Sequence, residues 1–190
     1  MRLTHATIAT SIASLSPLAD DDREPLRLIA RNPAIWTHWP RDMAEAKWDD
    51  NFDWMLQEQI AERWLFHTVR DGMGAVLGQT CYLAIRPEHR GVEIGGTWYC
   101  PSVQGTRVNP ACKLIMLAHA FACGAQRVEL KTHALNARSR AAMLKMGATF
   151  EGIHRRHMLL HDGSWRDTAW YSVLAEEWPS VKAGLLARLD

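Results

Sequence analysis

A strand, a polar turn and the start of a helix follow one another in the stretch Glu93-Ile-Gly-Gly-Thr-Trp-Tyr-Cys-Pro-Ser-Val-Gln-Gly-Thr-Arg-Val-Asn-Pro110. Gly95 and Gly96, inside the strand expected over residues 93–99, predict a bulge or a close approach of another backbone. Pro110 fits the first turn of a helix, whose apolar positions continue to Gly124.

The turn at residues 104–109 is the most informative part of this stretch. At a helix N-terminus, a glycine-bearing turn presents unpaired backbone N–H groups together with the positive end of the helix dipole, and such a place binds phosphate. The turn lacks the Gly-Lys-Ser/Thr ending of a P-loop and the GxGxxG of a dinucleotide site. From composition alone, an ordinary connecting loop is the better explanation, and phosphate binding is the alternative.

Outside this stretch, the hydrophobic pattern changes between the periods of strands and helices. Strands that pair as hairpins fill the first half of the chain, and strand–helix–strand units fill the second half. Together they describe an α/β fold on one mixed sheet, in one continuous domain over residues 1–190. The other predicted elements are a strand at 7–15, helices at 20–32 and 44–63, a hairpin of 64–70 and 76–86, a strand at 127–132, a helix at 137–146, a long hairpin over 152–174 that turns at Asp162-Gly163, and a helix at 180–189.

The composition argues against several classes of protein. Lys and Arg number 22 against 21 Asp and Glu, so the formal charge of +1 creates no global field for nucleic acid or an acidic membrane surface. No apolar run reaches the ~18 to 20 residues of a transmembrane helix, and the N-terminus lacks the dense apolar core of a secretory signal, so we expect a cytoplasmic protein. The four cysteines are too far apart in sequence for CxxC pairs and are expected to be reduced.

A second group of polar residues starts a later helix. The strand Val128-Glu-Leu-Lys-Thr132 is followed by Asn136-Ala-Arg-Ser139 and by a helix that ends at Lys145-Met-Gly147. Taken singly, Asn136 and Ser139 are explained as helix caps.

In this order and at this spacing, the motifs resemble the GNAT superfamily of N-acetyltransferases. The nearest likeness is to the Rim-type branch, which acetylates the N-termini of ribosomal proteins, and to its small-molecule relatives. The resemblance implies a single GNAT-like α/β domain with a mixed, mostly antiparallel sheet of about six to seven strands flanked by helices. It covers nearly the whole chain, including Leu15-Ser-Pro-Leu18, Trp36-Thr-His-Trp39, Val92-Glu-Ile-Gly95, Lys145-Met-Gly-Ala-Thr-Phe-Glu-Gly152 and Asp162-Gly-Ser-Trp-Arg-Asp167.

The resemblance also implies the activity. Such an enzyme transfers an acetyl group from acetyl-CoA to a primary amine by direct attack in a ternary complex, without a metal. The acceptor would be a protein or peptide N-terminus or a small-molecule amine, and Trp36 and Trp39 lie on a segment that the resemblance places around the acceptor cleft. The alternative is a CoA-binding module with lost or very weak transferase activity. The sequence leaves a homodimer open.

The family pattern assigns the CoA pyrophosphate to backbone amides of the 104–109 turn, and the pantetheine arm to the preceding strand and to Asn136. Arg107 and Asn109 depart from the family's usual small residues. If position 107 required a positive φ, Arg107 would be strained by roughly 1 kcal/mol, which a guanidinium near phosphate oxygens would offset. We expect Arg107 to be an extra phosphate ligand, and weakened binding is the alternative. The implied cofactor-binding residues are Trp98, Tyr99, Gln104, Gly105, Thr106, Arg107, Val108, Asn109, Asn136 and Ser139.

For catalysis, the resemblance implies a bulge amide near the thioester carbonyl and the Ser139 hydroxyl near the departing sulfur. Because a thiol pKa is ~8.5, the thiolate leaves readily and Ser139 is expected to help only modestly. This branch often has a carboxylate base on the strand after the helix that ends at Lys145-Met-Gly147, where the present chain has His154-Arg-Arg-His157. His157 is the predicted general base and Glu93 the second choice, with a surface or packing role for His157 as an equal alternative.

A zinc site formed by the three histidines of this hairpin is not expected. On a strand, His154 and His157 would point to opposite faces, and His157 and His161 would be ~13 Å apart.

Overall fold

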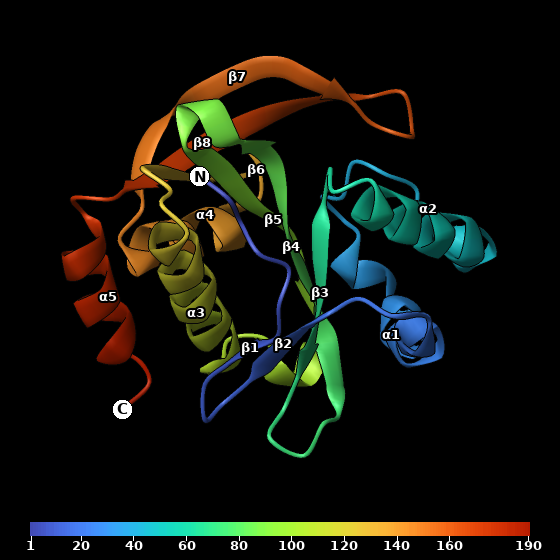
Figure 1. The fold of residues 1–190 in the computed structure, drawn as a ribbon. Coiled ribbons are helices and arrows are strands. Elements are labelled where there is room, and N and C mark those ends of the chain that lie inside the picture. Colours follow the sequence, from blue (N-terminus) through green and yellow to red (C-terminus); the bar gives the residue numbers. More distant parts are fainter.

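The strands form one mixed sheet in the order β1-β2-β3-β4-β5-β6-β8-β7 in the computed structural model, which describes all 190 residues (Figure 1). Every neighbouring pair is antiparallel except β5 and β6, which are parallel. The predicted α/β fold is confirmed, with eight strands instead of six or seven. The strands are β1 (Ile8–Ala9), β2 (Ser14–Pro17), β3 (Leu65–Arg70), β4 (Val76–Arg86), β5 (Gly91–Tyr99), β6 (Arg127–His133), β7 (Thr149–Leu159) and β8 (Trp165–Leu174).

Helices cover both faces of the sheet. α3, α4 and α5 lie on one face, and α1 and α2 lie on the other, against β3 and β4 (Figure 1). None of these helices is both long and apolar enough to cross a membrane. The helices are α1 (Arg23–Ala30), α2 (Trp48–Ile60), α3 (Val108–Ala122), α4 (Ala137–Met146) and α5 (Trp178–Leu186).

The single strand predicted at residues 7–15 is wrong, because the chain reverses there and forms the antiparallel pair β1 and β2. The Thr10 hydroxyl accepts hydrogen bonds from the amides of Ile12 and Ala13, at 3.1 and 3.2 Å. Such a side-chain bond to the backbone stabilises a turn. The extra strand explains why the sheet has one strand more than the sequence predicts.

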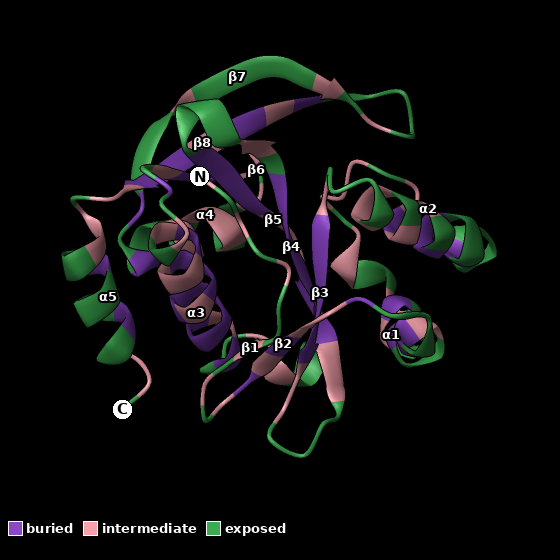
Figure 2. Ribbon diagram, in the orientation of Figure 1, coloured by how far each residue is buried: buried purple, intermediate pink, exposed green.

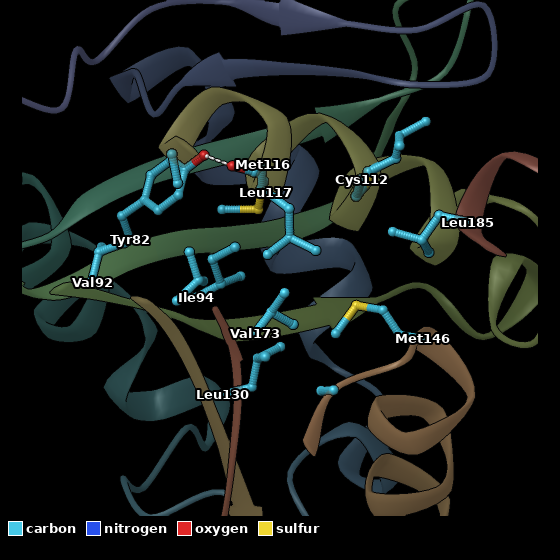
Figure 3. Close-up of a cluster of buried hydrophobic side chains, with 14 of the residues drawn as sticks. Tyr82, Val92, Ile94, Cys112, Met116, Leu117, Leu130, Met146, Val173 and Leu185 are labelled. Atoms are coloured by element: carbon cyan, nitrogen blue, oxygen red, sulfur yellow. Dashed lines mark hydrogen bonds between the residues drawn. The ribbon is translucent and has the colours of Figure 1, made fainter. Parts of the chain in front are cut away.

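Two apolar clusters hold the helices on the sheet. The larger lies between the sheet and α3, where Ile94 and Leu117 are almost completely buried (Figure 3). There the Tyr82 hydroxyl donates to the Met116 carbonyl oxygen at 2.7 Å, which anchors α3 to β4. The smaller cluster lies under α1 and α2. Figure 2 shows that the central strands are buried, whereas β7 at the sheet edge is mostly exposed.

Candidate active site

β5 and β6 pair only at their first residues and then separate. The parallel pairing joins Gly91–Glu93 to Arg127–Glu129 and goes no further. Beyond it, β5 stays paired with β4 as far as Tyr99, and β6 stays paired with β8 as far as His133. The facing edges of β5 and β6 therefore have backbone groups without sheet partners. Such edges can hydrogen-bond an extended ligand.

The bulge predicted in β5 is confirmed. One residue of β4, Thr80, lies opposite two residues of β5, Gly96 and Thr97. Gly96 has a φ of +55°, and a Cβ at this position would lie 2.7 Å from Cys81 Sγ. Only glycine fits at position 96, so this residue fixes the bulge. The bulge follows the point where β5 and β6 separate.

The turn before α3 presents free backbone donors. The N–H groups of Gly105, Arg107 and Asn109 donate to no acceptor in the protein. They lie at the N-terminus of a 15-residue helix, whose dipole adds positive potential. This arrangement suits a phosphate group, the role that the family resemblance implies for this turn.

Gln104 ties this turn to its surroundings. Its Nε2 donates to the Tyr99 carbonyl oxygen at 2.9 Å, and its Oε1 accepts a bond of 2.7 Å from Arg138 Nη1. The end of β5 is thereby joined to the first turn of α4. Tyr99 also donates through its hydroxyl to Asn109 Oδ1 at 3.1 Å, so its side chain braces the start of α3.

Arg107 is unstrained in this structure. Its φ of −70° and ψ of −10° are right-handed helical values, so the strain expected from a positive φ is absent. Its Nη1 donates to the carbonyl oxygen of Leu189 at 2.7 Å, which joins the turn to the C-terminal segment. The guanidinium thus has a structural contact, and its role as an extra phosphate ligand stays a prediction.

Replacing Arg107 by glycine is expected not to tighten the binding of CoA, since the substitution releases no strain. The variant loses the bond to Leu189 and gains flexibility when unfolded, so its free energy of unfolding should fall by about 1 kcal/mol. Calorimetric titration with CoA measures the first effect and urea unfolding the second, with Arg107→Ala as the control that lacks glycine's flexibility. A lower Kd for CoA in the glycine variant than in the wild type would contradict this interpretation.

Asn136 caps α4, which confirms one of its two predicted roles; the other is binding of the pantetheine arm. Its Oδ1 accepts from the Ser139 amide at 3.0 Å. The Asn136 Nδ2 group and the Ser139 hydroxyl have no hydrogen-bond partner in the protein, and neither is sealed from solvent. Both groups are free to contact a ligand, so their predicted roles toward the pantetheine arm and the sulfur stay predictions.

Glu93 lies almost completely buried against the bulge. Its Oε2 accepts from Lys131 Nζ at 2.9 Å, whereas Oε1 has no hydrogen-bond partner in the protein and is not sealed from solvent. A Cβ added to Gly95 would be 3.0 Å from Oε1, so this oxygen lies beside the residue that precedes the bulge. Burial raises the pKa of Glu93 and the Lys131 charge opposes the rise. A carboxylate of raised pKa with one free oxygen is suited to accept a proton.

His157 lies on the exposed strand β7. Its Nδ1 is 3.1 Å from Thr168 Oγ1. Desolvation lowers the pKa of His157 and the charge of Lys131 lowers it further, which favours the neutral imidazole. It can also accept a proton, although one of its nitrogens is engaged.

The expectation that His154 and His157 point to opposite faces is wrong. The pairing of β7 with β8 is irregular between His154 and Met158, and Arg156 has a φ of +49°. The extra residues break the alternation of a regular strand. Both rings therefore contact the Trp170 ring, at centroid distances of 5.2 and 5.7 Å. No group of three or more His, Cys, Asp or Glu side chains is placed to hold a metal ion.

Three tryptophans meet between the α1–α2 segment and β5. Trp36 is 5.3 Å from Trp39 and 5.2 Å from Trp98, measured between ring centroids. Trp98 is buried and donates through Nε1 to Gln79 Oε1 at 2.9 Å, so it offers a ligand only its backbone. Trp36 and Trp39 are half-buried and lie on the side of the sheet that Glu93 faces.

Lys113 is a buried residue that no motif in the sequence marks as part of the site. It lies within the apolar run of α3, and its Nζ donates to Thr97 Oγ1 in the bulge at 2.8 Å. Burial lowers the pKa of Lys113 to about 8. A lysine on the apolar face of a helix is the signal that could have revealed it.

Replacing Lys113 by methionine is expected to raise the free energy of unfolding at pH 7 by about 1–3 kcal/mol, because a buried charge is removed. Between pH 8 and 10.5, unfolded Lys113 binds a proton that the folded residue does not. Wild-type stability therefore rises with pH relative to the variant, and the advantage of the variant shrinks. Urea unfolding of both proteins at pH 7, 8.5 and 10 checks this, and a constant difference would refute it.

Known proteins with similar sequences and folds are acetyltransferases. Residues 14–149 match the family model described as an acetyltransferase (GNAT) domain. A structure of a protein assigned as an acetyltransferase of T. thermophilus is 31% identical, covers 100% of both chains and superposes with a TM-score of 0.90. A GCN5-related N-acetyltransferase from Brucella melitensis is 27% identical over 98% of this chain and 86% of its own, with a TM-score of 0.88.

A more distant structure shares the fold. Mycobacterium smegmatis RimJ, in complex with CoA-disulfide, is 24% identical over 98% of this chain and 91% of its own, with a TM-score of 0.79. Among curated proteins, none matches this chain. The family match over most of the sequence, and the relative that is 31% identical along its whole length, show that this chain belongs to the GNAT acetyltransferases.

Proposed function

We propose that this chain transfers an acetyl group from acetyl-CoA to a primary amine, either a protein or peptide N-terminus or a small-molecule amine. The observation that carries the proposal is the Glu93 carboxylate against the bulge of β5, where β5 and β6 separate. The likeness to RimJ, which is in complex with CoA-disulfide, supports a CoA ligand and favours the Rim-type branch. The cytoplasmic location and a homodimer stay predictions.

The free donors of the site fit CoA. The amides of Gly105, Arg107 and Asn109 would hold the pyrophosphate at the N-terminus of α3. The unpaired edge of β5 would hydrogen-bond the pantetheine arm, together with Asn136 Nδ2. Ser139 would donate its hydroxyl proton to a hydrogen bond with the departing sulfur.

Acetyl-CoA, when bound, supplies an acyl group activated as a thioester. Glu93 would take the proton that the attacking amine loses, directly or through one water, and backbone amides at the bulge would stabilise the negative charge that develops on the carbonyl oxygen. Glu93 is favoured over His157 as the base because its free oxygen lies beside the residue that precedes the bulge, whereas His157 Nδ1 is engaged by Thr168. His157 remains the second candidate.

An α-amine is the acceptor that this machinery suits best. An α-amino group with a pKa of ~7.8 is ~14% neutral at pH 7, whereas a lysine side chain with a pKa of ~10.4 is only ~0.04% neutral. A single weak base can therefore assist the attack of an N-terminal amine far more easily than the attack of a lysine side chain. Efficient acetylation of an internal lysine in a peptide with a blocked N-terminus would contradict this choice.

Two measurements test the proposal. Acetyl-CoA at ~100 times its Kd should stabilise the protein by ~2.7 kcal/mol, seen as a rise in Tm, and the absence of a rise would refute the CoA site. Release of free thiol from acetyl-CoA is then followed with a panel of small amines and N-terminal peptides. Acceptor-dependent release supports the transferase, and a Tm rise without release from any acceptor supports the inactive CoA-binding module instead.

A further inference from the structure

The sheet face that Glu93 shares continues over β6 and β8 as a polar surface. Lys131, which bonds Glu93, lies 4.9 Å above the Trp170 ring. At the end of β6, His133 lies 5.2 Å from His38 of the α1–α2 segment, between ring centroids. We call this surface the acceptor face, and its residues are Glu93, Lys131, His133, Arg166, Thr168 and Trp170.

Arg166 is the unusual member of the acceptor face. It is 5% exposed, and its Nε donates to Thr168 Oγ1 at 3.1 Å. No carboxylate lies within ion-pair distance of its guanidinium. Its two terminal nitrogens have no acceptor in the protein, yet neither is sealed from solvent. The N–H groups of the two terminal nitrogens are therefore free to bind a ligand, although most of the Arg166 side chain is buried.

The nearby acids bond groups other than Arg166. The Glu93 carboxylate is bonded by Lys131, Glu129 is paired with Arg86 and Arg127, and Asp167 accepts from the Arg156 amide. A buried cation that no carboxylate bonds costs stability, so this arrangement is not explained by folding alone. Burial lowers the pKa of Arg166 and the charge of Glu93 opposes this, so the two groups lie near each other without pairing.

We propose that the acceptor amine carries a carboxylate or phosphate group, which Arg166 binds through its two free terminal nitrogens while the amine faces Glu93. The planar guanidinium fork matches the oxygens of either group. The inference rests on the proposed function and adds the chemical class of the acceptor.

Matched acceptors test the inference on the wild-type enzyme. Both pairs are amidated tripeptides with the same free N-terminus: Ala-Asp-Gly and Ala-Asn-Gly form the carboxylate pair, and Ala-phosphoserine-Gly and Ala-Ser-Gly form the phosphate pair. We expect kcat/KM to favour the anionic member of at least one pair by about 10- to 100-fold, the range for hydrogen bonds to a charged group. The pair that shows the preference identifies the anionic group.

Variants assign the preference to Arg166. Arg166→Gln should bring the ratio of kcat/KM for the anionic acceptor to kcat/KM for the neutral acceptor close to one, and Arg166→Lys should give an intermediate ratio. The ratio is the readout because the charge of Arg166 also lowers the pKa of Glu93, so the activity with either acceptor alone can change. Arg155→Gln, an exposed arginine on β7, is the matched control and should keep the wild-type ratio. The Tm rise with acetyl-CoA shows that each variant is folded.

The outcomes separate this inference from the proposed function. If the wild type acetylates neutral and anionic members of both pairs equally, or if Arg166→Gln keeps the preference, the inference is overturned while the transferase stands. If acetyl-CoA raises Tm but no acceptor of a broad amine panel is acetylated, the proposed function fails, and the inference with it.

Discussion

Glu93→Gln is expected to lower kcat by about 10²- to 10⁴-fold, the usual contribution of a positioned general base. Glutamine has the same shape and can still accept the hydrogen bond from Lys131, but its amide does not take up a proton at neutral pH. The KM for acetyl-CoA should change little, because the free amides before α3 are untouched. Steady-state kinetics with the best acceptor of the screen measure both constants.

The pH dependence separates a base from a merely structural residue. Glu93 must be ionised to act, and burial raises its pKa, so wild-type kcat/KM should fall with decreasing pH earlier than it would for an ordinary glutamate. Glu93→Gln should lose this decrease and keep only the dependence of the acceptor amine. His157→Ala is the comparison, and most of its activity should remain. If His157→Ala lost more activity than Glu93→Gln, the histidine would be the base.

Local sequence signals predicted much of the fold and of the backbone geometry around the candidate site. The turn at Asp162-Gly163 is present, with the Asp162 carboxylate accepting from the Ser164 amide. Asn136 caps α4, and the glycines of β5 mark a real bulge. In each case the responsible residue acts on backbone within a few positions of itself, and a motif in the sequence records such short-range effects.

What the sequence did not reveal depends on long-range or irregular geometry. Arg107 bonds Leu189 at the far end of the chain, which no local pattern indicates. The irregular stretch of β7 turns His157 to the side of His154, although strict alternation predicts the opposite. Arg166 stands out only once its lack of a carboxylate partner is known. Each of these facts requires the partner strand or segment to be in place.

Asp22→Ala is expected to destabilise the fold by about 3–5 kcal/mol, the cost of leaving a buried network with its charge partner removed. Asp22 is 1% exposed and accepts from the Thr68 hydroxyl at 2.6 Å and from the Ala19 amide at 3.0 Å. It also pairs with Arg70, so it ties the start of α1 to β3. Without the carboxylate, the fully buried Thr68 hydroxyl and the Arg70 charge lose their partner.

The same change should loosen the site, because α1 leads into the segment that carries Trp36 and Trp39. Scanning calorimetry should show a Tm lower by roughly 6–20 °C, given the usual 2–4 °C per kcal/mol for a chain of this size. Asp21→Ala is the matched control, since Asp21 is an exposed neighbour, and its effect should stay within about 0.5 kcal/mol. Asp22→Asn keeps an acceptor for Thr68 but removes the charge, so it should fall between the two. Equal Tm values for Asp22→Ala and Asp21→Ala would show that this network does not hold α1 on the sheet, and the acceptor side would then depend on the apolar cluster alone.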